Sequence, residues 1–528
     1  MPSFTDTLAA GYGFTDPAVT LGAALEKDGT IHQEPKVKIP LAMLNRHGLI
    51  AGATGTGKTK TLQLLAEQLL AQGVPVFAAD IKGDLSGLAM PGDAGDRVTA
   101  RAKDVGWNWK PAGVPCEFVS LSGKLGVQLR ATVSSFGPLL LGKSLSLNDT
   151  QTSVLTMVFK YCDDSQLPLL DLSDLRAVLQ FLSSDEGKPA LAQYGGMSGA
   201  TVGVLLRKMI ELESQGAGVF FGEPEFDVKD MLHTTSDGRG IATVLELADV
   251  QDKPLLWSTF MMWMLAELYH NLPEAGDLPK PKLAFFFDEA HLLFADASKE
   301  FLSQVQQVIR LIRSKGVGVY FVTQTPKDVP DDVLGQLSNR VQHALRAHTP
   351  DDDTALRATV RTFPKTAFYD LEETLTSLGI GEAVVTVLDA RGTPTPVVAT
   401  RLIPPCSRMA PLTPDELQVD IRQSDYLAEY GQAVDRESAR EMLAARMAKT
   451  QPAPVPGASA PAPTPASAPA PARAGGRAGK TVAQVAGGAL VGALTSTIGR
   501  QVGREIVRGI FGMLGAKPGR STSRTSRW

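Results

Sequence analysis

Short apolar runs alternate along the chain with longer segments in which apolar residues recur every three or four positions. The runs with the length and composition of buried strands lie at residues 74–80, 116–121, 240–246, 283–287 and 317–323. The segments with helical periodicity between them lie at residues 59–71, 255–269 and 298–314. Strands that alternate with helices in this way favour an α/β fold around a central, mostly parallel sheet.

The alternation is interrupted between residues 91 and 238, where helical periodicity dominates. The candidate helices of this region lie at residues 148–161, 171–182 and 198–213. A mostly helical insertion between the strands of the core is the simplest account of this pattern. Farther along, apolar runs at 381–389 and 395–401 flank a turn with Gly and Pro, and we expect a hairpin that closes the edge of the sheet.

These patterns divide the chain into six parts. In order, they are a lead-in segment at 1–45, a core at 46–90 and 239–405, the helical insertion at 91–238, a helical extension at 406–450, a Pro/Ala-rich linker at 451–475 and a basic, Gly-rich tail at 476–528. The linker composition cannot form a core and favours an extended chain.

The tail carries two patterns that leave its role open. Arg500, Arg504 and Arg508 recur every four residues beside apolar positions, as in a basic amphipathic helix. Such a helix would contact nucleic acid, an anionic membrane surface or a partner protein. Because the many glycines disfavour a helix, a disordered basic tail is an equally good interpretation.

Charge is distributed unevenly over the 528 residues. The net charge is −4, but residues 473–528 hold ten Lys or Arg and one acid, which leaves −13 on the rest. The body therefore lacks the positive net charge that sequence-independent nucleic-acid binding needs, and any phosphate-binding surface on it must be local, as in a pore or groove. The three cysteines show no metal or disulfide spacing, and the N-terminus has no secretory signal pattern. We expect a cytoplasmic protein.

One contiguous motif indicates nucleotide binding. The pattern G-x-x-x-x-G-K-[ST] of a phosphate-binding loop is matched by Gly52, Ala53, Thr54, Gly55, Thr56, Gly57, Lys58 and Thr59. Its glycines let backbone N–H groups face a polyphosphate, and the helix that begins at Lys58 adds its positive end. We expect Lys58 to reach the β- and γ-phosphates of ATP and Thr59 to bind Mg²⁺.

A second motif far downstream supplies the acids that an NTPase needs. The strand candidate at 283–287 ends in Asp288 and Glu289. Asp288 is the candidate for the metal side, and Glu289 is the candidate for orienting and polarising the attacking water. Asp80 and Asp84, after the strand candidate at 74–80, either line the same site or cap the next helix.

Three polar residues are candidates for sensing or completing the site. Gln324 follows the strand candidate at 317–323, where it either contacts the γ-phosphate or only makes a hydrogen bond at the strand end. Arg340 and Arg346, in and after a further strand candidate, are candidates for an arginine that acts on the nucleotide of a neighbouring subunit.

Taken together, these motifs resemble the HerA-like branch of the FtsK/HerA superfamily over roughly residues 20–405. The resemblance implies a RecA-like P-loop NTPase core, ATP and Mg²⁺ as cofactors, and a hexameric ring that translocates on double-stranded DNA, sometimes beside a nuclease. It assigns the metal to Asp288, the water to Glu289 and the γ-phosphate sensor to Gln324, and it makes Arg340 the first choice for the trans-acting arginine. The stretch of about 50 residues before Gly52 is too short for the β-barrel of well-described HerA translocases.

Other functions are less compatible with the motifs. A small-molecule kinase needs an acceptor site with an Arg-bearing lid, and an ABC ATPase needs a signature that residues 121–124 do not match. Superfamily 2 helicases share the Asp-Glu-Ala-His string but carry a paired-arginine motif that is missing here. The remaining alternative is a nucleotide-switched scaffold, tethered by its tail, whose hydrolysis is indifferent to DNA.

Overall fold

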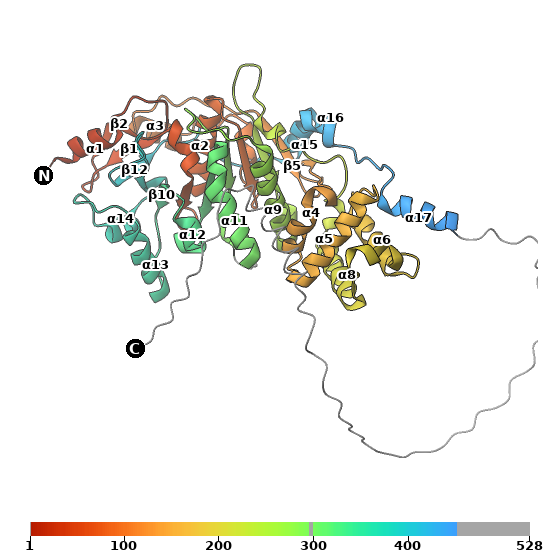
Figure 1. Cartoon of the computed structure of the whole chain (residues 1–528). Coiled ribbons are helices and arrows are strands. Elements are labelled where there is room, and N and C mark those ends of the chain that lie inside the picture. The colour runs from red at the N-terminus through yellow and green to blue at the C-terminus, as the bar shows by residue number, and fades with distance from the viewer. Residues whose placement is uncertain (1, 295–298, 451–528) are drawn as a thin grey trace, which may run out of the picture. The chain divides into compact units, whose positions relative to one another are not determined.

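The computed structural model describes residues 2–294 and 299–450 (Figure 1). All of them fall within one compact unit, Met1–Ala453. The linker predicted at 451–475 and the tail predicted at 476–528 lie outside the described residues. Within the described ranges, none of the helices combines the length and the apolar character needed to cross a bilayer.

A single twelve-stranded sheet organises the unit, in the order β2-β1-β12-β11-β10-β3-β9-β8-β4-β7-β5-β6. The strands are β1 (Ala18–Leu25), β2 (Ile31–Pro40), β3 (Gly48–Ala51), β4 (Val76–Asp80), β5 (Cys116–Ser120), β6 (Val127–Gln128), β7 (Ala242–Glu246), β8 (Leu283–Phe287), β9 (Val317–Thr323), β10 (Asn339–His343), β11 (Glu382–Thr386) and β12 (Val398–Leu402). From β10 to β6 all neighbours are parallel, whereas β10 to β2 pair antiparallel. The mostly parallel α/β fold is confirmed.

Helices cover both faces of this sheet. The α-helices are α1 (Phe4–Tyr12), α2 (Lys58–Ala71), α3 (Asp96–Asp104), α4 (Val133–Ser144), α5 (Asp149–Asp164), α6 (Leu172–Ser183), α7 (Lys188–Leu191), α8 (Gly199–Ser214), α9 (Pro254–Asn271), α10 (His291–Phe294), α11 (Lys299–Ile312), α12 (Asp331–Leu334), α13 (Pro350–Arg361), α14 (Leu371–Ser377), α15 (Pro414–Gln423), α16 (Asp425–Tyr430) and α17 (Ala439–Thr450). Short 3₁₀ turns join several of these elements.

Within the region 91–238, predicted as a helical insertion, lie α4, α5, α6, α7 and α8, but β5 and β6 also lie there and belong to the central sheet (Figure 1). The core therefore includes strands that the prediction assigned to the insertion. The three long helices begin where the apolar period begins because a polar side chain caps each one. Asn148, Asp171 and Ser198 each accept a hydrogen bond from a backbone N–H in the first turn. These caps set the first residue of each helix.

Two apolar layers hold the sheet between its helices. Alternate residues of a strand point to opposite faces, and in β8 Phe285 and Phe287 join one layer while Phe286 joins the other. The first layer includes α9, which packs beside α11 and α4 (Figure 1). Trp263 of α9 is fully buried there. This packing fixes the strand ends, and therefore the polar residues that follow them.

The expectation that the hairpin of residues 381–401 closes the sheet edge is wrong. β11 and β12 do form an antiparallel hairpin, but β12 also pairs with β1, and β2 lies at the edge. The first 45 residues thus form helix α1 and two sheet strands rather than a plain lead-in. The pattern hid β2 because Gln33 and Pro35 occupy positions in phase with Ile31, Val37 and Ile39 and so interrupt the apolar face.

Candidate nucleotide-binding site

The predicted phosphate-binding loop connects β3 to α2 at the carboxyl edge of the parallel strands. It leaves β3 at Ala51 and enters α2 at Lys58. Gly52 and Gly57 have φ angles of 155° and 112°, which other residues rarely adopt. A Cβ on Gly52 would also lie 2.4 Å from the Cβ of His343. The loop path therefore depends on these two glycines, and residues Gly52–Thr59 form one continuous cradle.

Lys58 lies against this cradle. Its Nζ donates a hydrogen bond to the carbonyl of Ala53 at 3.2 Å, and the hydroxyl of Thr56 donates to the same carbonyl at 2.7 Å. Burial lowers the pKa of Lys58, and the nearby Glu289 carboxylate partly offsets that effect. The ammonium is thus held beside the loop, in a position suited to a bound phosphate chain.

The second motif follows β8, which is separated from β3 only by β9. Asp288 is buried, and its Oδ1 accepts a hydrogen bond from the backbone N–H of Glu289 at 2.9 Å. Its Oδ2 is buried without a hydrogen-bond partner among the described residues. Burial, reinforced by the charges of Asp80 and Asp84, raises the pKa of Asp288 to about 7. This unpartnered oxygen is the type of ligand that Mg²⁺ prefers.

Glu289 occupies an unusual backbone position. Its φ is 47°, in the left-handed region, and only 3% of the residue is exposed. The carboxylate forms an ion pair with Lys82, in the loop after β4. His291 Nδ1 lies 3.1 Å from Oε2 of Glu289. The sequence interpretation missed Lys82, although it lies between Asp80 and Asp84, and β4 is a neighbour of β8.

Asp80 and Asp84 lie beside the candidate site, and the next helical turn, Ser86–Ala89, has no side-chain cap hydrogen bond. The carboxylate of Asp80 accepts hydrogen bonds from the backbone N–H groups of Lys82, Gly83 and Leu85, so it holds the loop in shape. One oxygen each of Asp80, Asp84 and Asp288 lie within 4.8 Å of one another. The loop acids therefore also border the candidate catalytic acids.

The residues present fit a magnesium ion. Asp288 and Asp84 each have a buried oxygen without a hydrogen-bond partner in the described part of the chain, whereas both oxygens of Asp80 are already used by the backbone. Mg²⁺ takes hard oxygen ligands and usually retains several waters, so few protein ligands are required. Asp288 and the hydroxyl of Thr59 would hold the ion, which would neutralise charge on the phosphates.

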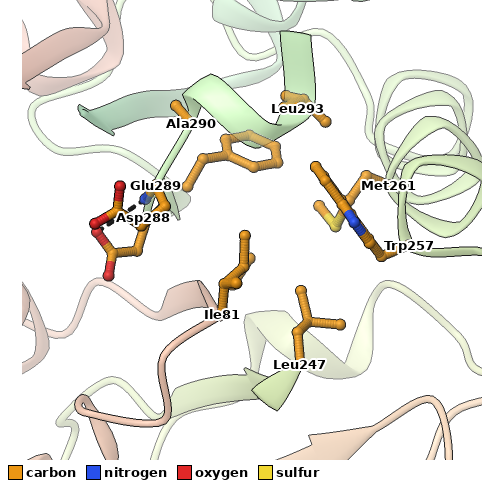
Figure 2. Close-up of a pocket in the computed structure, with 10 residues that line it drawn as sticks. Ile81, Leu247, Trp257, Met261, Asp288, Glu289, Ala290 and Leu293 are labelled. Atoms are coloured by element: carbon orange, nitrogen blue, oxygen red, sulfur yellow. Dashed lines mark hydrogen bonds between the residues drawn. The ribbon is translucent and has the colours of Figure 1, made fainter. Parts of the chain in front are cut away.

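A small apolar cavity of about 10 Å³ lies behind the two acids. Figure 2 shows Asp288 and Glu289 at one end of it and Ile81, Leu247 and Trp257 around the remainder. This volume holds one water at most. The apolar backing explains why the charged form of Asp288 is disfavoured, since little solvent reaches its buried side.

The remaining candidates, Gln324, Arg340 and Arg346, differ in where they lie relative to the carboxyl ends of their strands. Gln324 is exposed and directly follows β9, which lies between β3 and β8. Arg340 aligns with Leu49, inside β3, and its guanidinium donates to the carbonyls of Leu334, Leu337 and Thr362.

Arg346 lies beyond the carboxyl end of β10 and is exposed. Its Nη1 donates to the carbonyl of Thr376 at 3.2 Å. Of the two arginine candidates, it is therefore Arg346 that lies at the same edge as the phosphate-binding loop.

The model of the helicase HerA-like C-terminal family matches residues 26–519. The chain belongs to this family. Family membership confirms the resemblance found in the sequence and makes the chain a P-loop ATPase of the FtsK/HerA type. A comparison with curated proteins gives no match.

Solved structures similar to this HerA-like chain include the plasmid coupling protein TrwB in complex with the ATP analogue ADPNP. That structure has 14% identity and a TM-score of 0.51, and the alignment covers 78% of this chain and 94% of TrwB. VirB4 of Thermoanaerobacter pseudethanolicus has 14% identity and a TM-score of 0.44, with 73% and 97% covered. At this identity the TrwB likeness supports the fold alone.

A buried glutamate beside the site gives a testable prediction about stability. Glu246 is in register with Asp80 on the adjacent strand, and burial, together with the charges of Asp80, Asp84 and Asp249, raises its pKa to about 9. The folded state therefore holds a proton that the unfolded chain releases above about pH 4.5. Wild-type stability should consequently fall as pH rises from 4.5 to 9. We expect Glu246→Gln to stabilise the fold at pH 7 by up to roughly 3 kcal/mol.

Thermal unfolding of the two proteins between pH 5 and pH 8.5 measures this effect. The advantage of the glutamine variant should grow with pH, and an advantage that stays constant across this range would contradict the assignment. Glu117→Gln on β5 is the matched control. Burial raises the pKa of Glu117 as well, but hydrogen bonds from the Ser424 hydroxyl and the Asp425 backbone N–H oppose that rise, so this substitution should give a smaller gain than Glu246→Gln.

Proposed function

We propose that the chain hydrolyses ATP with Mg²⁺ and uses hydrolysis to translocate double-stranded DNA through a homo-oligomeric ring, a hexamer in the FtsK/HerA pattern. The observation that carries the hydrolytic part is the convergence of the phosphate-binding loop, Asp288 and Glu289 at one edge of a single sheet. TrwB, which has the same fold, has been solved with a non-hydrolysable ATP analogue. The cytoplasm is the expected location, and a nuclease is one expected partner.

Each candidate residue would have one role in ATP hydrolysis. The N–H groups of Gly52, Ala53 and Thr56 already donate to backbone carbonyls, so other N–H groups of the loop and the Lys58 ammonium would bind the phosphates. Thr59 and Asp288 would hold Mg²⁺. Glu289 accepts the hydrogen bond of the attacking water and polarises it. Gln324 contacts the γ-phosphate. Because Glu289 is paired with Lys82, the carboxylate must share this partner, or part from it, before it can act on water.

The structure bears on the choice of the trans-acting arginine. The sequence interpretation put Arg340 first, but its guanidinium is occupied by three backbone carbonyls and its position aligns with the interior of β3. Arg346 is exposed and lies past the strand, at the nucleotide edge. We therefore assign the role of arginine finger to Arg346.

Hydrolysis measured with different polymers tests the translocation proposal. Purified protein should release phosphate from ATP faster with duplex DNA than with single-stranded DNA, RNA or no polymer, because only the polymer that moves through the ring is coupled to turnover. Glu289→Gln serves as the blank for contaminating ATPases. Turnover that depends on Glu289 but ignores every polymer would contradict translocation and favour the nucleotide-switched scaffold.

Removal of residues 451–528 addresses the scaffold directly. If this segment tethers the protein to a membrane surface, nucleic acid or a partner, the shortened protein should lose its cellular position while keeping its ATPase activity. An unchanged position would argue against tethering.

A further inference from the structure

One aspartate holds the backbone on both sides of Gln324. Thr323 ends β9 and is fully buried, and Gln324 follows it at an exposed position. Asp328 lies in the 3₁₀ turn Pro326–Asp328, just past this point. Its Oδ2 accepts hydrogen bonds from the Thr323 hydroxyl at 2.8 Å and from the backbone N–H of Thr325 at 3.0 Å. The residues before and after Gln324 are therefore tied to one carboxylate oxygen.

The turn that carries Asp328 is closed by hydrogen bonds of its own. The Thr325 hydroxyl accepts from the backbone N–H of Lys327 at 3.1 Å, and the backbone N–H of Asp328 donates to the Thr325 carbonyl at 3.1 Å. With the bond from the Thr325 N–H to the Asp328 carboxylate, these contacts form a capping box, and Pro326 occupies the first position of the turn. The carboxylate is thus held in one place relative to the end of β9.

The end of β9 is bonded in turn to the phosphate-binding loop. The backbone N–H of Gly52, the first residue of the loop, donates to the Thr323 carbonyl at 3.2 Å. Thr323 thus joins Asp328 through its hydroxyl and the loop through its carbonyl. Burial lowers the pKa of Lys58, and the charge of Asp328 is among those that oppose this effect, which places Asp328 near the cradle. Asp328 therefore fixes the backbone of Gln324 relative to the candidate phosphate site.

The side chain of Gln324 depends on this backbone for its position. Within residues 2–294 and 299–450, no hydrogen bond or ion pair engages its amide. The amide is thus available to a ligand, and the hydrogen bonds of Thr323 and Thr325 determine where it can reach. Asp328, by contrast, already has one oxygen engaged by two protein donors. This arrangement suits a residue that holds another in place.

We propose that Asp328 is the positioning residue of the γ-phosphate sensor. By fixing the backbone around Gln324, it places the amide at hydrogen-bond distance from the γ-phosphate and thereby favours ATP over ADP. The inference rests on the sensor role that the proposed function gives to Gln324. Because Asp328 acts through geometry rather than through charge, a neutral side chain of the same shape should replace it.

Two substitutions of Asp328 separate geometry from charge. Asp328→Ala should lower kcat for ATP by about 10–100-fold, since a small displacement of a positioned group is enough for such a loss. Asp328→Asn should keep most of the wild-type rate, because its amide oxygen can accept the same two hydrogen bonds. Phosphate release at saturating ATP measures both variants. An asparagine variant that loses as much as the alanine variant would overturn the positioning role.

A double-mutant cycle shows whether Asp328 acts through Gln324. If it does, Asp328→Ala should add little to the loss already caused by Gln324→Ala, as expected for two residues that are coupled. Losses that multiply would show two independent roles and overturn the inference. Gln324→Ala with the wild-type rate would instead contradict the sensor role in the proposed function, so the two failures are distinguishable.

Nucleotide affinity gives a readout that damage to the fold does not reproduce. In the Glu289→Gln background, where hydrolysis should be slow, calorimetry measures ATP as well as ADP. Adding Asp328→Ala should weaken ATP by about tenfold, the effect of losing one hydrogen bond to a charged group, and leave ADP unchanged. Equal weakening of both nucleotides would contradict the assignment. Asp171→Ala is the matched control, because it removes the capping aspartate of α6 and should change neither the rate nor either affinity.

A buried threonine keeps the test informative if Asp328→Ala does not fold. Thr323→Val removes one of the two donors to Asp328 and nearly preserves the shape of the side chain. It should lower kcat by a smaller factor than Asp328→Ala and likewise add little to Gln324→Ala. A rate unchanged from wild type would overturn the inference.

Discussion

Replacement of Glu289 by glutamine should slow ATP hydrolysis by about 10²–10⁴-fold and leave nucleotide binding intact. This range is the usual contribution of a positioned general base. Glutamine has the same shape and a lone pair but no charge to draw a proton from water. The substitution leaves Lys58 and Thr59 untouched, so the phosphates keep their contacts. Phosphate release under saturating ATP measures the rate, and calorimetry with ADP measures binding.

The ion pair with Lys82 supplies the control for this experiment. Lys82→Gln breaks the same pair but leaves the Glu289 carboxylate in place. The Lys82 side chain is 45% exposed, whereas that of Glu289 is 4% exposed, so the variant keeps the buried acid and removes only its cationic partner. This variant should keep its rate within about tenfold of wild type, since the base remains. If it loses as much as Glu289→Gln, the ion pair rather than the acid determines turnover, and the role given to Glu289 is wrong.

The sequence was informative where a function is encoded in a few adjacent residues. The phosphate-binding loop is one run of consecutive residues, and Asp288 and Glu289 are adjacent in the sequence. Each motif follows an apolar strand that its length and composition predict. Apolar residues at helical spacing predicted α5, α6 and α8 in the same way. The α/β class and the family follow from these local signals.

The sequence was uninformative where packing joins segments that are far apart. Lys82 contacts Glu289 only because β4 and β8 are neighbours in the sheet. Glu246 lies beside Asp80 only because of the register in which β7 pairs with β4. The cavity of about 360 Å³ beside α2 needs α3 and the residues around β11 and β12 to meet. None of these proximities leaves a local pattern.

Arg346→Ala should reduce turnover by about 10³–10⁵-fold, the range attributed to arginine fingers that stabilise charge on the transferred phosphoryl group. The affected site would be that of the neighbouring subunit, so nucleotide binding by the variant chain should persist. Arg361→Ala is the matched control. It removes the same charge from an exposed position at the end of α13, and it should leave the rate unchanged.

Mixing two inactive variants distinguishes action in trans from action within one chain. Where an Arg346→Ala subunit lies next to a Glu289→Gln subunit in a mixed ring, one of the shared sites combines an intact glutamate with an intact arginine. Activity should therefore rise above the sum of the separate variants. No recovery after subunit exchange would contradict the assignment of Arg346. Recovery with Arg340→Ala in place of Arg346→Ala would return the role to Arg340, which would then have to leave its three backbone carbonyls in the assembled ring.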